Sequence, residues 1–159
     1  MRRVLKVLLV LIITVLAGVQ IVRPPRTNPP ADPADALTRY VPAHVAGILD
    51  RSCRDCHSNE TRWPWYSHVA PASWFVIDHV DHGRSNFNYS KWPTYGAEQQ
   101  LSIRRSSCEM ARAGTMPMPS YVLLHRTARL SPSDIEALCA WAVPAAAHSP
   151  SARRTSQVR

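Results

Sequence analysis

The chain has 159 residues, the length of one ordinary domain with short appendages, and a formal net charge of +8. The charge is unevenly placed, because residues 27–150 hold eleven Lys and Arg and all eleven Asp and Glu, and are therefore neutral. A neutral domain has no basic stripe for a phosphate backbone, which excludes nucleic-acid binding as the meaning of the charge.

Residues 1–22 predict an N-terminal membrane anchor, with a cleaved signal peptide as the alternative. Three cations precede an apolar run from Val7 to Val22 of 16 residues, or of 19 counted from Val4. A transmembrane helix needs about 17 to 25 residues, so the run is just long enough. It continues past Ala17, which favours a retained transmembrane helix. The cations before the run outnumber those directly after it, which places the rest of the chain on the far side of a membrane that the chain crosses once.

Residues 23–38 are rich in proline and predict an extended spacer, residues 39–144 the folded domain, and residues 145–159 a disordered basic tail. A helix is expected from Pro42, whose apolar face runs on to Cys53 and Cys56. Further helices are expected over 72–82, ended by Gly83, and over 97–113, ended by Gly114.

Residues 115–130 predict a loop, and the last helix is the best signalled. Ser131 is its N-cap, Pro132 its first residue and Asp134 the partner in a capping box. No alternating strand pattern occurs, so the fold class is all-α with long loops, the transmembrane helix coming first.

The segment Cys53-Arg54-Asp55-Cys56-His57 carries the main chemical signal, and three chemistries compete for it. Structural zinc usually needs a second close pair of ligands, whereas Cys108 and Cys139 are single. A redox dithiol needs its motif at a helix N-terminus after a strand, and no strand is predicted. Covalent haem fits the spacing, because two cysteines three apart reach both vinyl groups while the next histidine binds the iron.

A six-coordinate haem iron needs a second axial ligand, usually methionine or histidine. Met116 is preferred, because it stands before a proline in the loop that leads to the last helix, and Met118 is the second choice. His79 and His125 are alternatives, either as ligands or as residues of the haem pocket. Cys108 and Cys139 form a disulfide or are two small buried side chains, and both readings stay open.

Three segments resemble a bacterial family of haem-binding domains, small membrane-anchored proteins related to c-type cytochromes. The segments begin at Cys53, His79 and Gly114, and the resemblance covers about residues 1–143. It implies a cytochrome c-like helical domain in the periplasm with one haem c attached to Cys53 and Cys56. Single residues also correspond to motifs of the family: His57 ends its CxxCH element, Met116 and Pro117 match its Met-Pro, Tyr121 and His125 its Tyr-x-x-x-His, His79 and Gly83 its His-Val-x-x-Gly, and Tyr89 and Trp92 its aromatic pair.

The expected function is one-electron transfer with a periplasmic or membrane partner, and no enzyme activity. Aromatic side chains between residues 58 and 95 are expected to exclude water from the haem. The alternative is a five-coordinate haem that senses a gas or turns over peroxide, with His79 or His125 as the distal group. A haem-carrying scaffold or chaperone is a third possibility, which a covalent bond to the haem disfavours.

Overall fold

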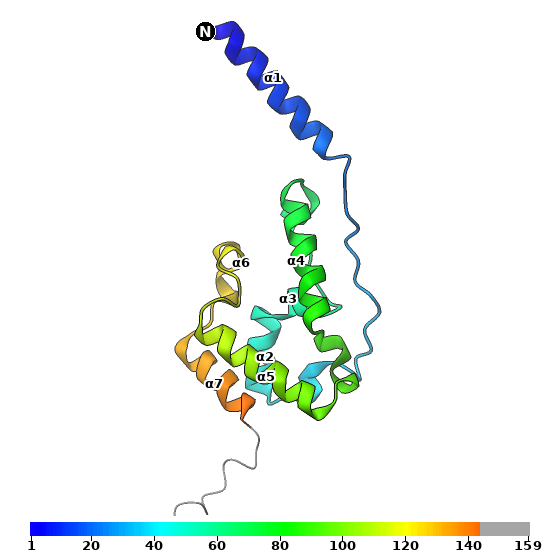
Figure 1. Ribbon diagram of the computed structural model, residues 1–159, viewed down its shortest axis with the longest axis vertical. Coiled ribbons are helices and arrows are strands. Elements are labelled where there is room, and N and C mark those ends of the chain that lie inside the picture. Colours follow the sequence, from blue (N-terminus) through cyan, green and yellow to red (C-terminus); the bar gives the residue numbers. More distant parts are fainter. Residues whose placement is uncertain (144–159) are drawn as a thin grey trace, which may run out of the picture. The chain divides into compact units, whose positions relative to one another are not determined.

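The computed structural model describes residues 1–143, and all regular secondary structure in this part of the chain is helical (Figure 1). The α-helices are α1 (Arg2–Val19), α2 (Ala43–Ser52), α3 (Arg54–His57), α4 (Ala72–Asn86), α5 (Ala97–Arg112), α6 (Pro119–Leu124) and α7 (Pro132–Ala142). The 3₁₀ helices are η1 (Leu37–Arg39), η2 (Trp65–His68), η3 (Tyr89–Thr94) and η4 (Arg126–Ala128). No strand occurs in residues 1–143, which confirms the all-α fold class there. The predicted basic tail lies outside the described residues.

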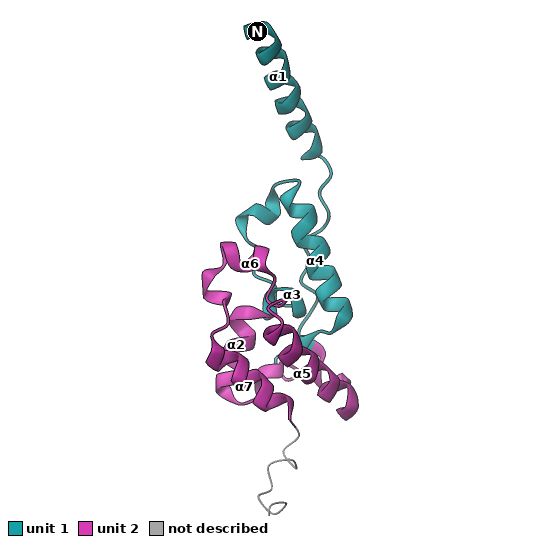
Figure 2. Ribbon diagram, turned by 60° about the vertical axis from the view of Figure 1, so that its left-hand side comes forward, with its two compact units in different colours: residues 1–33, 54–90 teal, residues 34–53, 91–159 magenta. Residues whose placement is uncertain are grey.

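The chain divides into two compact units (Figure 2). Unit 1 comprises residues 1–33 and 54–90, and the described part of unit 2 comprises residues 34–53 and 91–143. The division falls inside the cysteine motif, since Cys53 ends one segment of unit 2 and Arg54 begins one of unit 1.

Helix α1 does not meet the expectation of a transmembrane helix. Within residues 1–143, no helix has the length and apolar character that crossing a membrane requires. Helix α1 has 18 residues, and it ends at Val19, before the apolar run is complete. Its first turns include Arg2, Arg3 and Lys6, which shorten the uncharged part.

The proline-rich segment after α1 is hydrogen-bonded to the rest of unit 1. The Asn28 side chain donates to the Thr61 carbonyl oxygen at 2.9 Å, and the Asn59 side chain donates to the Pro30 carbonyl oxygen at 2.9 Å. Proline has no backbone N–H to donate, and these contacts are made by side chains, one from the segment itself and one from the loop after His57. Residues 26–30 therefore pack as part of unit 1 as well as connecting α1 to it.

Helix α4 runs four residues beyond the predicted end at His82. Gly83 lies inside the helix and is buried, so the expectation that it ends the helix is wrong. A Cβ atom built on Gly83 would lie 2.5 Å from the carbonyl oxygen of Cys56. The glycine is needed for the close approach of α3 to α4, and not for a left-handed turn.

Unit 2 is built around α2, α5 and α7, and its interior is apolar. The predicted apolar face is confirmed over Val45, Ile48 and Leu49, which are buried, but it does not run on to Cys56, because α2 ends at Ser52. Helices α5 and α7 are joined by a disulfide between Cys108 and Cys139, whose Cα atoms are 4.7 Å apart. Of the two readings of these cysteines, the structure therefore contains the disulfide.

The ends of α5 and α7 are as predicted. Gly114 follows α5 with φ of +66°, a conformation that glycine adopts without steric cost. Ser131 caps α7 and forms the capping box with Asp134, while Pro132 is the first helical residue. The Asp134 carboxylate also pairs with Arg51 of α2 at 2.5 Å, and this pairing lowers its pKa to about 2.

The predicted loop 115–130 contains two short helices, α6 and η4. Pro119 occupies the first turn of α6, where proline costs no hydrogen bond. Ala128 in η4 is fully buried. Helix α6 has six residues, fewer than two turns, so an apolar repeat in the sequence cannot distinguish it from a loop.

Candidate functional site

The cysteine motif spans the junction of α2 and α3, and not the end of one helix as predicted. Cys53 is the C-cap residue of α2, with φ of −129° and ψ of −32°, outside the range of helical backbone. Helix α3 then carries Cys56 and His57. Cys53 and Cys56 are thiols and do not form a disulfide with one another.

The His57 ring is held by residues that follow α4. It stacks on the Phe87 ring with centroids 4.1 Å apart and planes 8° apart, and the Tyr89 ring is tilted by 56° with its centroid 6.2 Å away. The Nδ1 atom is 3.4 Å from the Phe87 carbonyl oxygen, and a carbonyl oxygen only accepts hydrogen bonds. The proton is therefore assigned to Nδ1, and Nε2 keeps the lone pair that binds a metal.

The surroundings of His57 favour its neutral form. Burial lowers the pKa of the imidazole, and this effect outweighs the opposing effect of the Phe87 and Gly83 carbonyl groups. A histidine must be neutral to bind a metal ion. Both the orientation and the protonation state of His57 thus suit an axial ligand.

Cys56 has the character of a protonated thiol. Burial and the neighbouring Asp55 carboxylate together raise its pKa to about 11, against the opposing charge of Arg84. Reactive dithiols need the opposite shift, since the thiolate is the nucleophile. The site therefore lacks the electrostatics of a thioredoxin-like centre.

A structural zinc site gains no support in the part of the chain that is described. Residues 1–143 contain no group of three or more His, Cys, Asp or Glu side chains that could hold a metal ion. The two thiols and His57 instead follow the order that covalent haem requires, with the imidazole fixed by a carbonyl group behind it. The residues present fit a haem c group.

The loop after His57 is buried and is held by Arg84 of α4. The guanidinium group donates to the Ser58 carbonyl oxygen at 2.7 Å and to the Thr61 hydroxyl oxygen at 2.8 Å. It also donates to the Thr27 carbonyl oxygen at 2.7 Å and to the Asn28 side-chain oxygen at 2.9 Å. One side chain therefore ties the loop after the motif, helix α4 and the proline-rich segment together.

A second set of hydrogen bonds fixes the same loop to the residues after α4. The Asn59 backbone donates to the Ser90 hydroxyl at 3.0 Å, and the Asn88 side chain donates to the Asn59 side-chain oxygen at 2.7 Å. All three residues are buried. Buried polar groups that are paired in this way define a single arrangement. The network keeps His57 aligned with Phe87, which lies just before Asn88.

The other predicted site residues are divided between the units. His79 belongs to unit 1, and its Nδ1 atom is 2.8 Å from the Phe75 carbonyl oxygen. Met116 belongs to unit 2, is 42% exposed, and donates its backbone N–H to the Met110 carbonyl oxygen. Met118 is the N-cap residue of α6 and is half-buried.

Tyr121 of α6 and His125, the C-cap residue of that helix, form the predicted pair in unit 2. Their rings stack with centroids 4.3 Å apart and planes 12° apart, as the i and i+4 spacing allows. The choice among Met116, Met118, His79 and His125 as second axial ligand stays a prediction.

Phe87 and Arg84 are the residues of the site that the sequence did not indicate. Phe87 lies 30 residues after His57, and nothing in the local pattern connects them. Arg84 had a usable signal, because it is the only Lys or Arg between residues 63 and 90. A single Lys or Arg in a stretch of 28 residues, whose other charged residues are Asp78 and Asp81, is a candidate for hydrogen bonds to buried acceptors.

The fold and the site together define a helical protein in which His57 directly follows the Cys53 and Cys56 thiols and is hydrogen-bonded through Nδ1. The family model of the haem-binding domain matches residues 14–143. The chain belongs to this haem-binding family, which confirms the resemblance and supports haem binding. No match was found among curated proteins or among solved structures. Likeness to the cytochrome c fold therefore stays a prediction.

Proposed function

We propose that the protein carries one haem c, attached to Cys53 and Cys56, and that it transfers single electrons. The observation that carries the proposal is the state of His57, which directly follows two thiols and is neutral, stacked on Phe87 and hydrogen-bonded through Nδ1. When bound, haem iron supplies reversible one-electron chemistry. The chain's own residues hold the group, orient His57 and keep the loop behind it fixed.

Met116 is proposed as the second axial ligand. A thioether ligand raises the potential of a haem iron above that of a bis-histidine site. The backbone of Met116 is held by its hydrogen bond to the Met110 carbonyl oxygen, and α6 begins three residues later. The Met116 side chain is exposed, so it has room to change its orientation. Met118, His79, His125 and Tyr121 are the alternatives for a ligand or a pocket residue.

We propose that helix α1 directs the chain to the bacterial inner membrane and that the rest of the chain works in the periplasm. Cations at the start of α1 and exposed apolar side chains along it support this attachment. The Cys108–Cys139 disulfide agrees with an oxidising compartment. The redox partner would be a periplasmic or membrane protein, and the protein itself would be a carrier and not an enzyme.

Carbon monoxide tests the carrier proposal, because it binds only where the reduced iron has an open position. The wild-type protein, matured with haem, should bind carbon monoxide slowly and show a low-spin absorption spectrum. Met116→Ala should open the position and bind carbon monoxide rapidly, while Met110→Ala serves as a control of similar exposure on α5.

Two results would count against this account of the iron. Rapid carbon monoxide binding to the wild type would favour the gas-sensing or peroxidase alternative. An unchanged low-spin spectrum in Met116→Ala would move the second ligand to Met118, His79 or His125.

A further inference from the structure

Residues 63–76 form an aromatic segment without formal charge. It contains no Lys, Arg, Asp or Glu, yet includes three tryptophans, a tyrosine and a phenylalanine. It comprises η2, the turn after it and the first residues of α4. The side chains that hold His57 and the loop after it come from residues 84–90, outside this segment.

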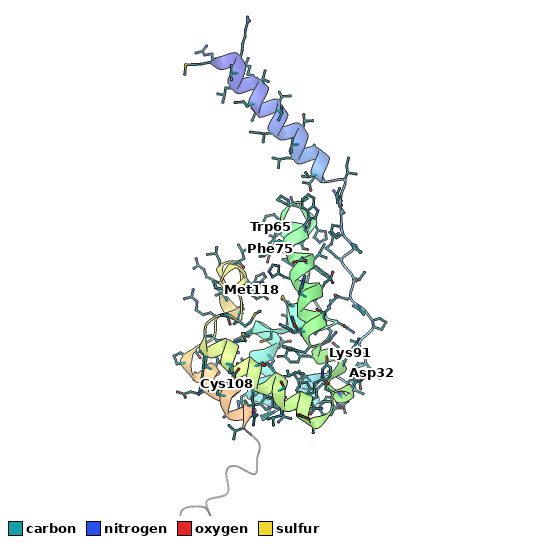
Figure 3. All side chains as sticks on the ribbon, in the orientation of Figure 1. Asp32, Trp65, Phe75, Lys91, Cys108 and Met118 are labelled. Atoms are coloured by element: carbon teal, nitrogen blue, oxygen red, sulfur yellow. A yellow bond between two sulfur atoms is a disulfide. The ribbon has the colours of Figure 1, made fainter. Side chains whose placement is uncertain are left out.

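Several apolar side chains of this segment are open to solvent. Trp65 is 78% exposed, Phe75 51% and Val69 45%. Single exposed apolar residues are common, but large ones gathered at one place usually mark an interaction surface. Figure 3 shows Trp65 and Phe75 at the same end of α4, and η2 packs against that helix.

The same end of unit 1 is fastened to the end of α1. The Gln20 side chain donates to the Ala70 carbonyl oxygen at 3.0 Å and accepts from the Ala70 N–H at 3.0 Å. The Trp74 indole N–H donates to the Val22 carbonyl oxygen at 2.7 Å. These hydrogen bonds hold the exposed aromatic segment directly against the C-terminal end of α1.

We propose that residues 63–76 dock on the surface of the lipid bilayer, with Trp65, Val69 and Phe75 in the headgroup region. The inference rests on the proposed attachment of α1 to a membrane. Tryptophan favours the membrane interface, where its ring is apolar and its N–H stays hydrated. The fastening of Gln20 and Trp74 to their backbone partners would hold the segment at the depth at which α1 ends.

The distribution of charge along α4 agrees with this placement. No charged side chain in residues 63–76 would have to lose water on docking, which is the main cost of entering the interface. Charges resume at Asp78 and Asp81. Ser85 lies ten residues after Phe75, about 15 Å further along the helix axis, and is exposed.

Photocrosslinking to lipid tests the proposal. p-Benzoylphenylalanine replaces Trp65, Phe75, Ser85 or Leu9, one at a time, in the full-length haem-loaded chain bound to vesicles of phosphatidylethanolamine and phosphatidylglycerol. All four positions are exposed, so the replacements leave the interior intact. Intact mass after irradiation should show phospholipid adducts at positions 9, 65 and 75, and only the unirradiated background at position 85.

The possible results distinguish docking of residues 63–76 from attachment through α1 and from haem binding. Adducts at position 9 without adducts at 65 and 75 would overturn docking while keeping attachment through α1. Equal adducts at 75 and 85 would also overturn it, since the surface would not be specific. Absence of adducts at position 9 would overturn attachment and docking together, whereas the haem absorption of the same samples reports separately on the haem proposal.

Discussion

Arg84 connects three segments of unit 1 through a single guanidinium group. Its four hydrogen bonds reach the loop after His57 and the proline-rich segment. Burial lowers the pKa of this guanidinium, which remains far above neutrality in any protein. The planar fork of an arginine suits several acceptors at once, and a lysine cannot replace it.

Arg84→Lys should therefore destabilise the protein by at least about 2 kcal/mol, because buried acceptors lose charged donors. Denaturant unfolding of the wild type and the variant measures the difference. Arg62→Lys is the matched control, since the Arg62 side chain is 58% exposed and its ion pair with Asp55 is therefore open to solvent. Equal stabilities for the two variants would show that the Arg84 contacts contribute little.

At the scale of elements, the approach of α3 to α4 decides where the cysteine motif lies. Gly83 makes this approach possible, because any side chain there would meet the backbone of Cys56. The carbonyl carbon and the Cβ atom of Cys56 would be 3.0 and 3.2 Å from an added Cβ. Backbone cannot move aside as a flexible side chain does, so α3 would have to shift.

Gly83→Ala is expected to destabilise the protein by about 1 to 3 kcal/mol and to disturb the His57 ligand. Gly47→Ala is the control, because Gly47 lies within α2 with nothing near its added Cβ, and alanine should stabilise that helix by up to about 1 kcal/mol. Thermal unfolding and the haem absorption spectrum measure both effects. Stabilisation by both substitutions would mean that α3 and α4 are not packed so closely.

The disulfide between α5 and α7 also acts at the scale of elements, because it joins these two helices covalently. It closes a segment with a sequence separation of 31, which in the chain-entropy account corresponds to about 4 kcal/mol. Cys108→Ser together with Cys139→Ser should lower the free energy of unfolding by an amount of this order. Reduction of the wild type should produce a similar loss, and a stability unaffected by either treatment would contradict the expected contribution.

At the scale of the whole molecule, the sequence predicted best what depends on neighbouring residues. The Ser131 cap and the Gly114 end of α5 are local, and both are confirmed. The prediction for Gly83 was wrong because glycine occurs both at helix ends and where two helices pack closely. Only the position of α3 shows that Gly83 has the second role. Helix α1 shows a similar limit, since it ends at Val19 and leaves the last part of the apolar run, up to Val22, outside the helix.

The sequence indicated the residues of the cysteine motif, but not the residues that hold His57 in place. Spacing alone indicated Cys53, Cys56 and His57, because ligand geometry fixes their separation. The partners of His57 come from residues about thirty positions later and depend on how α4 ends. The same holds for the disulfide, which needed the packing of α5 against α7 before its two readings could be separated.

The central claim is the covalent attachment of one haem through two sulfur atoms, and intact mass measures it most directly. Protein produced with a cytochrome c maturation system should carry the mass of one haem, retained after denaturation and extraction with acidified acetone. Cys53→Ala together with Cys56→Ala should lose that mass, while Cys108→Ser together with Cys139→Ser should keep it. Wild-type protein without the added mass, or with haem that the solvent removes, would contradict the account.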